Sequence, residues 1–562
     1  MKRDLAMMAA RRHDLLIIGG GITGACIARD AALRGLDVAL IEKNDFSSAT
    51  SSGSSKLVHG GLRYLANFEL GLVRESLRER RIWERIAPHM VDPVPFLIPL
   101  YGAKNTLTLK IGLTLYDFLS YDRNRLEDPD KRMPGHVRIS REEALARAPY
   151  LNPRGLTGAM IYYDCQMYSP ERIGVECIGD AADRGAAIAN HADVTEILTE
   201  EAGNARRVTG ARVTDSLTGE SHVIRAELTV NATGPWGDMV MAMAERDGTP
   251  ARRLIRSKGI HLITRDITGG MALAVQPKDG GHFFVIPWRG HTLIGTTDTV
   301  FTGRPDALGV SEKDIADFLG VINKGLPGLD LGRDDVEHFY AGLRPLVDTD
   351  PNPDDSDGKK DSYGASRASE VFDHASEGLE SFLSALGGKW TTSRHLAEQV
   401  VDLSLEKLGR PKTPSVTART AVQGGEITRY AEFEAAAIAR YPAMPRDIVI
   451  NLARNYGSRM DDVIEIAEQA HRADLLDPLS NATVTIGAQA LYAVRMEMAR
   501  TLDDVIQRRT GLGTLGHPGH DTLRRIADIV GHELGWDENE KTRQIAAAER
   551  RFRTRDDAPA AA

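Results

Sequence analysis

The chain has 562 residues and a formal net charge of −9, and 42% of its residues are hydrophobic while 27% are charged. A chain of this length is expected to contain more than one domain and to bury a substantial core. The negative balance argues against nucleic acid as the main partner. The three cysteines form no C-x-x-C pair, so we predict neither a disulfide framework nor a zinc site, and a reducing cytoplasm is the simplest compartment.

The N-terminal segment, residues 1–12, is positively charged but has no apolar core long enough for a signal peptide, and we predict that it is flexible. No stretch approaches the roughly 20 apolar residues that a membrane-spanning helix requires. Contact with a membrane surface is a separate question that these observations leave open.

Residues 15–41 predict a strand, a glycine turn, a helix and a second strand in this order. Gly19, Gly21 and Gly24 have the G-x-G-x-x-G spacing, in which the glycines permit a tight turn, close approach of a pyrophosphate and packing of helix on strand. Glu42 ends the second strand, near the spacing expected of an acid that binds a ribose. The glycine turn alone is weak support, but the full order favours nucleotide binding over a purely structural turn.

The next segments predict two helices and then a region rich in strands. Helical spacing of apolar residues covers residues 70–86 and 106–121. The second of these helices is explained by packing, with membrane contact as the alternative. Alternating apolar and polar residues predict strands of a sheet-rich second domain at residues 207–214, 222–230, 259–264, 283–287 and 292–295.

The last third of the chain changes in character. Residues 348–366 are rich in Pro, Asp and Gly and predict an exposed loop. Residues 383–400 again predict a strand, a Gly-Gly turn and a helix. From about residue 411, amphipathic patterns predict a helical domain, with helices at residues 429–440, 447–456, 460–472 and 487–509.

Several short motifs lie along nearly the whole chain: GGGITGACIARDAALRG (19–35), SSKLVHGGLRYL (54–65), KIGLTLYDFL (110–119), NATGPW (231–236), FFVIPW with IGTTD (283–298), GLRPL (342–346), GGKWTTSR (387–394) and NYGSR (455–459). Together they resemble the FAD-dependent, aerobic and quinone-linked glycerol-3-phosphate dehydrogenases. HGGLRYL and GGK-x-T-T-x-R are specific to that family and its near relatives, whereas the first glycine turn is not.

The resemblance implies an α/β fold with α+β character, in which a Rossmann-type FAD-binding domain is interleaved with an antiparallel-sheet substrate domain and followed by an all-α domain. We expect the first two domains within residues 13–410, the helical domain within residues 411–550 and a disordered tail from residue 551. The FAD segments are expected at about residues 13–90, 150–255 and 375–405.

The resemblance also implies the reaction. It is the oxidation of sn-glycerol 3-phosphate to dihydroxyacetone phosphate, with hydride transfer from C2 to N5 of FAD and electrons passed to membrane quinone. It further implies peripheral association with the cytoplasmic face of the inner membrane, and a homodimer.

The substrate's phosphate requires several cations, and arginine suits it because its planar fork binds two oxygens at once. By resemblance, the candidates are Arg63, Arg344 and Arg367, with Lys389 beside the flavin. Taken alone, each arginine would more often be a surface residue or half of an ion pair. Tyr64 either donates a hydrogen bond to the substrate or only packs.

The reaction requires a base with a pKa near neutrality, which favours histidine. His59 is the candidate base, and the alternative is a histidine that only binds the backbone of its Gly-Gly turn. Arg344 is expected to anchor the C2 hydroxyl or the developing carbonyl oxygen. His261 and His291 lie in predicted strands and are expected to be structural.

Small residues and backbone donors are expected to surround the FAD, because a larger Cβ substituent would block its approach. The Gly-Gly-Lys turn before a helix offers N–H groups and an ammonium to the negative edge of reduced flavin. Hydroxyl groups of the Ser/Thr-rich loop either contact FAD or only cap turns. No His, Cys or Asp cluster has metal-ligand spacing, so no catalytic metal is predicted. The predicted FAD-binding residues are Gly19, Gly20, Gly21, Ile22, Thr23, Gly24, Glu42, Thr50, Ser54, Ser55, Leu57, Val194, Ala232, Gly234, Gly388 and Lys389.

Three alternatives stay open. The first is an oxidase that reduces O2 in place of quinone. The second is a dehydrogenase of a longer polyol phosphate such as erythritol phosphate. The third is a flavin-binding sensor that catalyses no redox reaction. The arginine set and His59 argue against the sensor.

Overall fold

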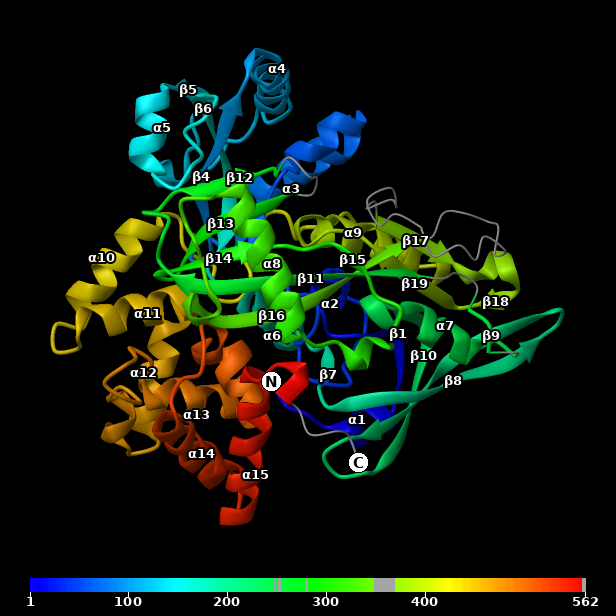
Figure 1. Ribbon diagram of the computed structural model, residues 1–562. Coiled ribbons are helices and arrows are strands. Elements are labelled where there is room, and N and C mark those ends of the chain that lie inside the picture. Colours follow the sequence, from blue (N-terminus) through cyan, green and yellow to red (C-terminus); the bar gives the residue numbers. More distant parts are fainter. Residues whose placement is uncertain (247, 251–253, 278–281, 348–368, 558–562) are drawn as a thin grey trace.

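The computed structural model describes the chain except residues 247, 251–253, 278–281, 348–368 and 558–562, and except the side chains of residues 63, 66, 104, 105 and 557. The loop predicted at residues 348–366 and the candidate Arg367 therefore lie outside the described residues. Figure 1 shows two sheets, each with helices beside it, and a group of C-terminal helices.

The first sheet has a parallel centre in the order β19-β10-β1-β2-β7. An antiparallel edge strand, β17, pairs with β19, and β10 continues into the antiparallel pair β9 and β8, with β18 beside β9. The strands are β1 (Arg12–Ile18), β2 (Val38–Ile41), β7 (Ala187–Ala189), β8 (Ala192–Ala202), β9 (Ala205–Asp215), β10 (Ser221–Asn231), β17 (Ser369–Asp373), β18 (Leu379–Glu380) and β19 (Phe382–Gly387).

Both faces of this sheet are buried, because successive residues of a strand point to opposite sides. In β1, Leu15 and Ile17 belong to one core, while Leu16 and Ile18 belong to another. The first core contains residues of α2 (Ile22–Leu33), α6 (Pro170–Asp183) and α9 (Ser393–Lys407), and the second contains residues of α1 (Leu5–Ala9) and α7 (Gly237–Ala244). This is the layering expected of a dinucleotide-binding sheet.

The second sheet is mostly antiparallel, in the order β15-β11-β14-β13-β12-β4-β6-β3, with β16 beside β11 and β5 beside β6. Residues of α5 and α8 pack in the core on one face, and residues of α3 and α4 in the core on the other. The elements are β3 (Leu57–Val58), α3 (Leu70–Ile86), β4 (Val91–Tyr101), α4 (Ala103–Leu119), β5 (Val137–Ile139), α5 (Arg141–Arg147), β6 (Leu156–Met167), β11 (Leu254–Arg265), β12 (Ala272–Val275), β13 (Phe283–Trp288), β14 (His291–Gly295), β15 (Thr299–Val300), α8 (Glu312–Gly325) and β16 (Val336–Val347).

The C-terminal helices share a core of their own. In Figure 1 they run from yellow to red on one side of the two sheets. They are α10 (Tyr430–Arg440), α11 (Arg446–Tyr456), α12 (Met460–Gln469), α13 (Gly487–Arg495), α14 (His520–Leu534) and α15 (Glu538–Glu549).

The strands predicted at residues 207–214, 222–230, 259–264, 283–287 and 292–295 are confirmed as β9, β10, β11, β13 and β14. Their grouping in one second domain is wrong, because β10 pairs in parallel with β1 and so belongs to the FAD-type sheet together with β9. This placement agrees instead with the FAD segment expected at about residues 150–255. The alternation of residues reports that a strand is present, but it does not report which sheet the strand joins.

Both chain ends differ from the prediction of flexible or disordered segments. Residues 5–9 form α1, whose Leu5 and Met8 are buried, and Arg3 binds Asp215 at 2.7 Å. At the other end, short 3-10 turns form at Arg550–Phe552 and Arg555–Asp557, and the Arg555 N–H donates to the Val310 carbonyl at 2.8 Å. Long-range contacts of this kind order segments whose composition alone favours disorder.

The single helix predicted over residues 487–509 is also wrong. Helix α13 ends at Arg495, Met498 has a left-handed φ of 59°, and the chain resumes as a π-helical segment, η10 (Asp504–Arg509). The Asp504 carboxylate accepts from the N–H groups of Arg500 and Thr501 at 2.9 and 3.0 Å, which ends the interruption. The amphipathic pattern continues across this break, but Thr501 and Asp504 form a capping box, in which the Asp504 N–H donates to Thr501 Oγ1 at 3.1 Å. This T-x-x-D motif is a local signal of a new helix start that was missed.

Candidate functional site

One cavity of about 2430 Å³ lies between the two sheets. Pockets for small molecules usually measure about 300–1,000 Å³, so this one has room for a dinucleotide and a substrate together. Its wall contains most of the residues predicted from the sequence: Gly19, Gly21, Ile22, Thr23, Glu42, Thr50, Ser54, Ser55, Leu57, His59, Tyr64, Val194, Ala232, Gly234, Arg344, Gly388 and Lys389.

The glycine turn after β1 is packed so tightly that side chains are excluded. Gly19 has a φ of +108°, and a Cβ there would lie 2.6 Å from the Ala232 carbonyl oxygen. A Cβ on Gly24 would lie 1.9 Å from the Gly19 oxygen. Gly24 and Gly20 are predicted FAD contacts that do not appear in the cavity wall; Gly24 instead lets α2 approach the turn, so that its N-terminus faces the cavity.

Glu42, at the end of β2, is anchored by backbone donors. Its carboxylate accepts from the Gly20 N–H at 2.7 Å and from the Asn44 N–H at 2.9 Å. Burial raises the pKa of Glu42, whereas these two hydrogen bonds favour its ionised form. The carboxylate is therefore held in a fixed position on the cavity wall.

The Ser/Thr-rich loop after β2 contributes hydroxyl groups that also bind the protein itself. Thr50 Oγ1 donates to the Leu343 carbonyl at 2.7 Å, and Ser54 Oγ accepts from the Lys56 N–H at 3.3 Å. Ser51 was missed from the sequence, although its Oγ accepts from the Ile22 N–H at 2.8 Å and so caps the start of α2. Its only sequence signal is membership of the same serine run.

His59 lies in the cavity wall at the end of a buried polar network. Its N–H donates to Thr391 Oγ1 at 3.2 Å. The next N–H, of Gly60, donates to Tyr116 Oη at 3.0 Å and to Asp164 Oδ1 at 3.2 Å. Arg80 binds the same carboxylate at 2.5 Å. This network fixes the Gly-Gly turn that carries His59.

Lys389 and Tyr64 are neighbours in the cavity wall. Lys389 Nζ lies 4.2 Å from the centroid of the Tyr64 ring and donates to Ser76 Oγ at 2.7 Å. Gly61 has a φ of +75°, and a Cβ there would lie 2.3 Å from the Tyr64 ring. Tyr64 therefore packs closely and also borders the cavity, so both of its predicted roles are compatible with its position.

Arg344, on β16, is half-buried with its guanidinium held by neutral oxygens. It donates to Ser257 Oγ and Thr296 Oγ1, each at 3.0 Å, and to the Thr297 carbonyl at 3.2 Å. The Asp298 carboxylate lies 3.8 Å away. The arrangement fixes the direction of a positive charge on the cavity wall.

His261, expected to be structural, also borders the cavity. Its Nε2 lies 2.9 Å from Ser55 Oγ, and its ring stacks on Tyr340 at 4.8 Å between centroids. Burial, then the charges of Arg344 and Lys56, lower its pKa well below the usual value, so the ring is neutral at neutral pH. The side chain reaches the cavity only because β11 lies next to β16, and this pairing has no local signal in the sequence.

Other predicted residues lie elsewhere or are not described. His291 pairs with Glu337 at 3.2 Å rather than facing the cavity. The backbone of Arg63 lies in the 3-10 segment η1 (Leu62–Asn67), but its side chain is among those not described. Arg63 and Arg367 therefore stay predictions.

Comparison with known proteins agrees over both parts of the chain. A family model described as "FAD dependent oxidoreductase" matches residues 14–394, and one described as "C-terminal domain of alpha-glycerophosphate oxidase" matches residues 415–541. A glycerol-3-phosphate dehydrogenase of Synechocystis sp. is 35% identical over 547 residues, which cover 95% of each chain. An aerobic glycerol-3-phosphate dehydrogenase of Staphylococcus aureus is 34% identical over 516 residues, 89% of this chain and 86% of that one. The chain belongs to the FAD-dependent glycerol-3-phosphate dehydrogenase family.

The structural comparison agrees with this assignment. The crystal structure of the family member from Bacillus halodurans, complexed with FAD, has a TM-score of 0.76 and 28% identity and covers 98% of this chain and 96% of that one. The predicted fold class is confirmed, and FAD is the cofactor of this oxidoreductase family. The residues of this chain fit the cofactor, because the turn at Gly19 and Gly24 leaves no space for side chains and the cavity continues past Glu42.

Proposed function

We propose that this protein oxidises sn-glycerol 3-phosphate to dihydroxyacetone phosphate and passes the electrons to a membrane quinone. The observation that supports this most is that one cavity contains both the glycine turn with Glu42 and the cations Arg344 and Lys389. A dinucleotide and an anionic substrate therefore fit side by side. The curated relatives from Synechocystis and Staphylococcus aureus carry the name of the same activity.

In this proposal, the cofactor is held by the turn at Gly19 and Gly21, by Glu42 and by the Gly388–Lys389 turn. Bound FAD supplies the acceptor for two electrons at N5. Lys389 and Arg344 attract the phosphate end and the C2 oxygen of the substrate, and the predicted residues Arg63 and Arg367 add the paired charges that a dianion requires.

His59 is the proposed base that takes the proton of the C2 hydroxyl, and the charge of Arg344 lowers the pKa of that alcohol. His261 is a second candidate, because its ring borders the same cavity beside Arg344, but its lowered pKa makes it a weaker base than a histidine that titrates near neutrality. Neutral imidazole is the form that accepts a proton. The pH dependence of the reaction therefore distinguishes the two histidines.

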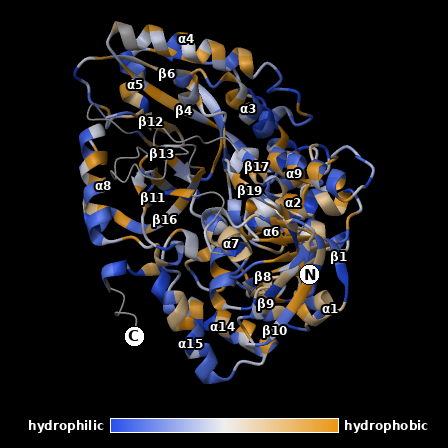
Figure 2. Cartoon of the chain, turned by 90° about the vertical axis from the view of Figure 1, so that its right-hand side faces the viewer, coloured by the Kyte–Doolittle hydropathy of each residue, from blue (hydrophilic) through white to orange (hydrophobic). Residues whose placement is uncertain are grey.

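The proposal for a quinone acceptor is supported by helix α4. Leu107, Ile111 and Phe118 lie on one face of this helix and are 62%, 62% and 73% exposed. Ile111 also lines the cavity, together with Leu109 and Leu115 of the same helix. Figure 2 shows α4 at the outer edge of the molecule, with apolar residues along it. An apolar acceptor dissolved in a bilayer would reach the cavity along this helix.

The neighbouring helix adds positive charge to this end of the molecule. Helix α3, which packs beside α4, carries exposed Arg78 and Arg85. Basic side chains next to apolar ones are typical of proteins that bind anionic membrane surfaces. Among the described residues, no helix is long and apolar enough to cross a membrane.

The substrate is tested by anaerobic titration of the FAD-loaded protein with sn-glycerol 3-phosphate and, separately, with erythritol phosphate. We expect glycerol phosphate to bleach the visible flavin band at lower concentration. Preferential bleaching by erythritol phosphate would contradict the substrate assignment. Adding a quinone analogue, or air, to the bleached protein then identifies the acceptor, and faster reoxidation by air would favour the oxidase.

A further inference from the structure

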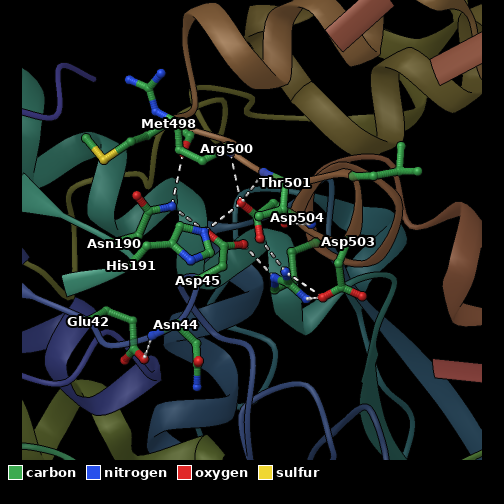
Figure 3. A network of polar contacts seen from close by, with 12 residues as sticks. Glu42, Asn44, Asp45, Asn190, His191, Met498, Arg500, Thr501, Asp503 and Asp504 are labelled. Carbon is green, nitrogen blue, oxygen red and sulfur yellow. Dashed lines mark hydrogen bonds and ion pairs between the residues drawn. The ribbon is translucent and has the colours of Figure 1, made fainter. Parts of the chain in front are cut away.

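The C-terminal domain contacts the FAD-binding half at residues 42–45, the segment that follows β2 and is called the Glu42 loop below. Asp45, three residues further along, is 1% exposed and accepts hydrogen bonds from both Arg508 and Arg509 of the C-terminal domain. The distances to Asp45 oxygens are 2.5 Å from Arg508 Nε, and 2.7 and 2.9 Å from the two Nη atoms of Arg509. Figure 3 shows Asp45 within this network, with Glu42 and Asn44 beside it.

The same loop is held from its other side by the turn between β7 and β8. The N–H groups of His191 and Ala192 donate to the carbonyls of Asn44 and Glu42 at 2.7 and 2.9 Å. Nδ2 of Asn190 donates to Asp45 Oδ1 at 2.9 Å and to the Met498 carbonyl of the C-terminal domain at 3.0 Å. His191 Nε2 lies 2.9 Å from Asp504 Oδ2. The Glu42 loop and the turn between β7 and β8 therefore both bind the C-terminal domain.

The C-terminal partners come from the π-helical segment η10. In a regular α-helix, consecutive side chains point about 100° apart, yet here the consecutive residues Arg508 and Arg509 both bind Asp45. Arg508 also binds Asp503 and Asp504 at 3.0 and 2.8 Å. Single-turn π-helices occur frequently at functional sites.

The charges of this cluster are balanced within the protein. Burial alone would raise the pKa of Asp45, but the Arg509 and Arg508 guanidinium groups hold it well below its usual value, so the group is ionised. Burial lowers the pKa of His191, but Asp504 outweighs this effect and raises it. Asp45, His191 and Asp504 lie close enough to ligate a metal ion, but a cation would have to displace guanidinium groups from both carboxylates. The cluster is therefore an ion-pair junction between domains.

We propose that the C-terminal domain holds the Glu42 loop in its FAD-binding conformation, with Asp45 as the positioning residue that connects the two. The Asn44 N–H that fixes Glu42 belongs to the peptide segment leading directly into Asp45. Release of Asp45 from the two arginines frees this segment, and Glu42 then loses one of its two backbone anchors. Docking of the C-terminal domain and binding of FAD are thus coupled, and each strengthens the other.

The test compares Asp45→Asn with Glu497→Gln. Glu497 is the control, because it is 4% exposed and its carboxylate binds Arg172 of α6 at 2.7 Å across the same domain junction. Arg509 contacts only the backbone carbonyl of Glu497, which the substitution to glutamine retains. Both substitutions keep the shape of the side chain and remove one buried carboxylate. The measurements are the dissociation constant of FAD for the apo-protein, by fluorescence titration well below the melting temperature, and the melting temperature of the apo-protein.

We expect both variants to lower the melting temperature of the apo-protein, and only Asp45→Asn to weaken FAD binding, by about tenfold or more. Equal FAD affinity of the two variants would overturn the proposal and leave Asp45 as a purely structural tie. If Asp45→Asn does not fold, His191→Asn replaces it. Asparagine tolerates the left-handed φ of 49° at this position, and the substitution removes only the contact to Asp504. A several-fold weaker binding of FAD is expected, and unchanged binding would overturn the proposal.

The proposal rests on the proposed role of Glu42 in binding FAD, and Glu42→Ala separates the two. If Glu42→Ala weakens FAD binding while Asp45→Asn does not, the coupling is wrong and the role of Glu42 stands. If neither substitution weakens FAD binding, the role of Glu42 is wrong and the coupling fails with it.

Discussion

His59 and His261 border the same cavity. Substituting each histidine separately shows which of them is the catalytic base. We expect His59→Gln to lower kcat by about 100- to 1000-fold and to remove the acid limb of the pH profile, since a general base contributes about 10²–10⁴-fold. His261→Gln should retain that limb, because His261 contacts Ser55 Oγ and we assign it no proton transfer. The measurement is the pH dependence of anaerobic flavin reduction for both variants.

The reverse result, in which His261→Gln loses the acid limb and His59→Gln retains it, would transfer the role of base to His261. Retention of FAD, checked by the visible spectrum of each variant, ensures that the comparison concerns proton transfer and not cofactor loss.

Glu84 of α3 is a second residue whose environment makes a testable prediction. It is 1% exposed, and burial raises its pKa from 4.5 to about 7, although Arg80 lowers it. The folded protein therefore prefers the protonated form. The stabilisation from this preference is full below about pH 4.5 and is lost as the pH rises to about 7, a loss of about 3 kcal/mol at most.

Glu84→Gln removes this titration and keeps the neutral shape. We expect the variant to melt at a higher temperature than the parent at pH 8, with the difference shrinking towards pH 5. Melting curves of both proteins across this range make the test. A difference that is independent of pH would show that Glu84 does not titrate with a raised pKa.

At the scale of one element, helix α4 is the proposed membrane-binding surface. Replacing Leu107 and Phe118 together by glutamate should abolish binding to anionic vesicles, because the substitutions place charges on the exposed apolar face. Neither side chain lines the cavity, so reduction of the flavin by substrate should be unchanged. Vesicle flotation measures the binding. Val321→Glu on α8, where Val321 is 41% exposed, is the control and should bind as the parent does.

Persistent flotation of the α4 double variant would contradict membrane contact through this helix. The outcome concerns the acceptor side of the proposal only, since neither substituted residue lines the cavity.

Elements with a strong local pattern were predictable, and those shaped by distant contacts were not. The glycine turn, α2 and β2 follow from neighbouring residues, so the turn at Gly19 and the position of Glu42 were predicted correctly. The interruption between α13 and η10 was missed, because it depends on Asp504 accepting from backbone N–H groups and on Asn190 binding the Met498 carbonyl. The second contact links residues 308 positions apart and leaves no periodicity in the sequence.

At the scale of the whole molecule, the cavity forms where two sheets meet, and each sheet supplies half of the site. The sequence motifs predicted most of the residues that line it on the FAD side, because each motif is a short local pattern that is recognisable without the contacts between motifs. The placement of His261 beside Arg344 required the pairing of β11 with β16, and that of Asp45 beside Arg509 required the docking of the C-terminal domain. These long-range arrangements are what the structure adds.

The central claim is that C2 of sn-glycerol 3-phosphate is oxidised in this cavity by the bound flavin. The most direct measurement is anaerobic stopped-flow reduction of the FAD-loaded protein by sn-glycerol 3-phosphate and by the same compound deuterated at C2. The account predicts that the visible flavin band bleaches completely and that the deuterated substrate bleaches it more slowly. A band that persists at saturating sn-glycerol 3-phosphate, or one that bleaches at the same rate with both substrates, would contradict it.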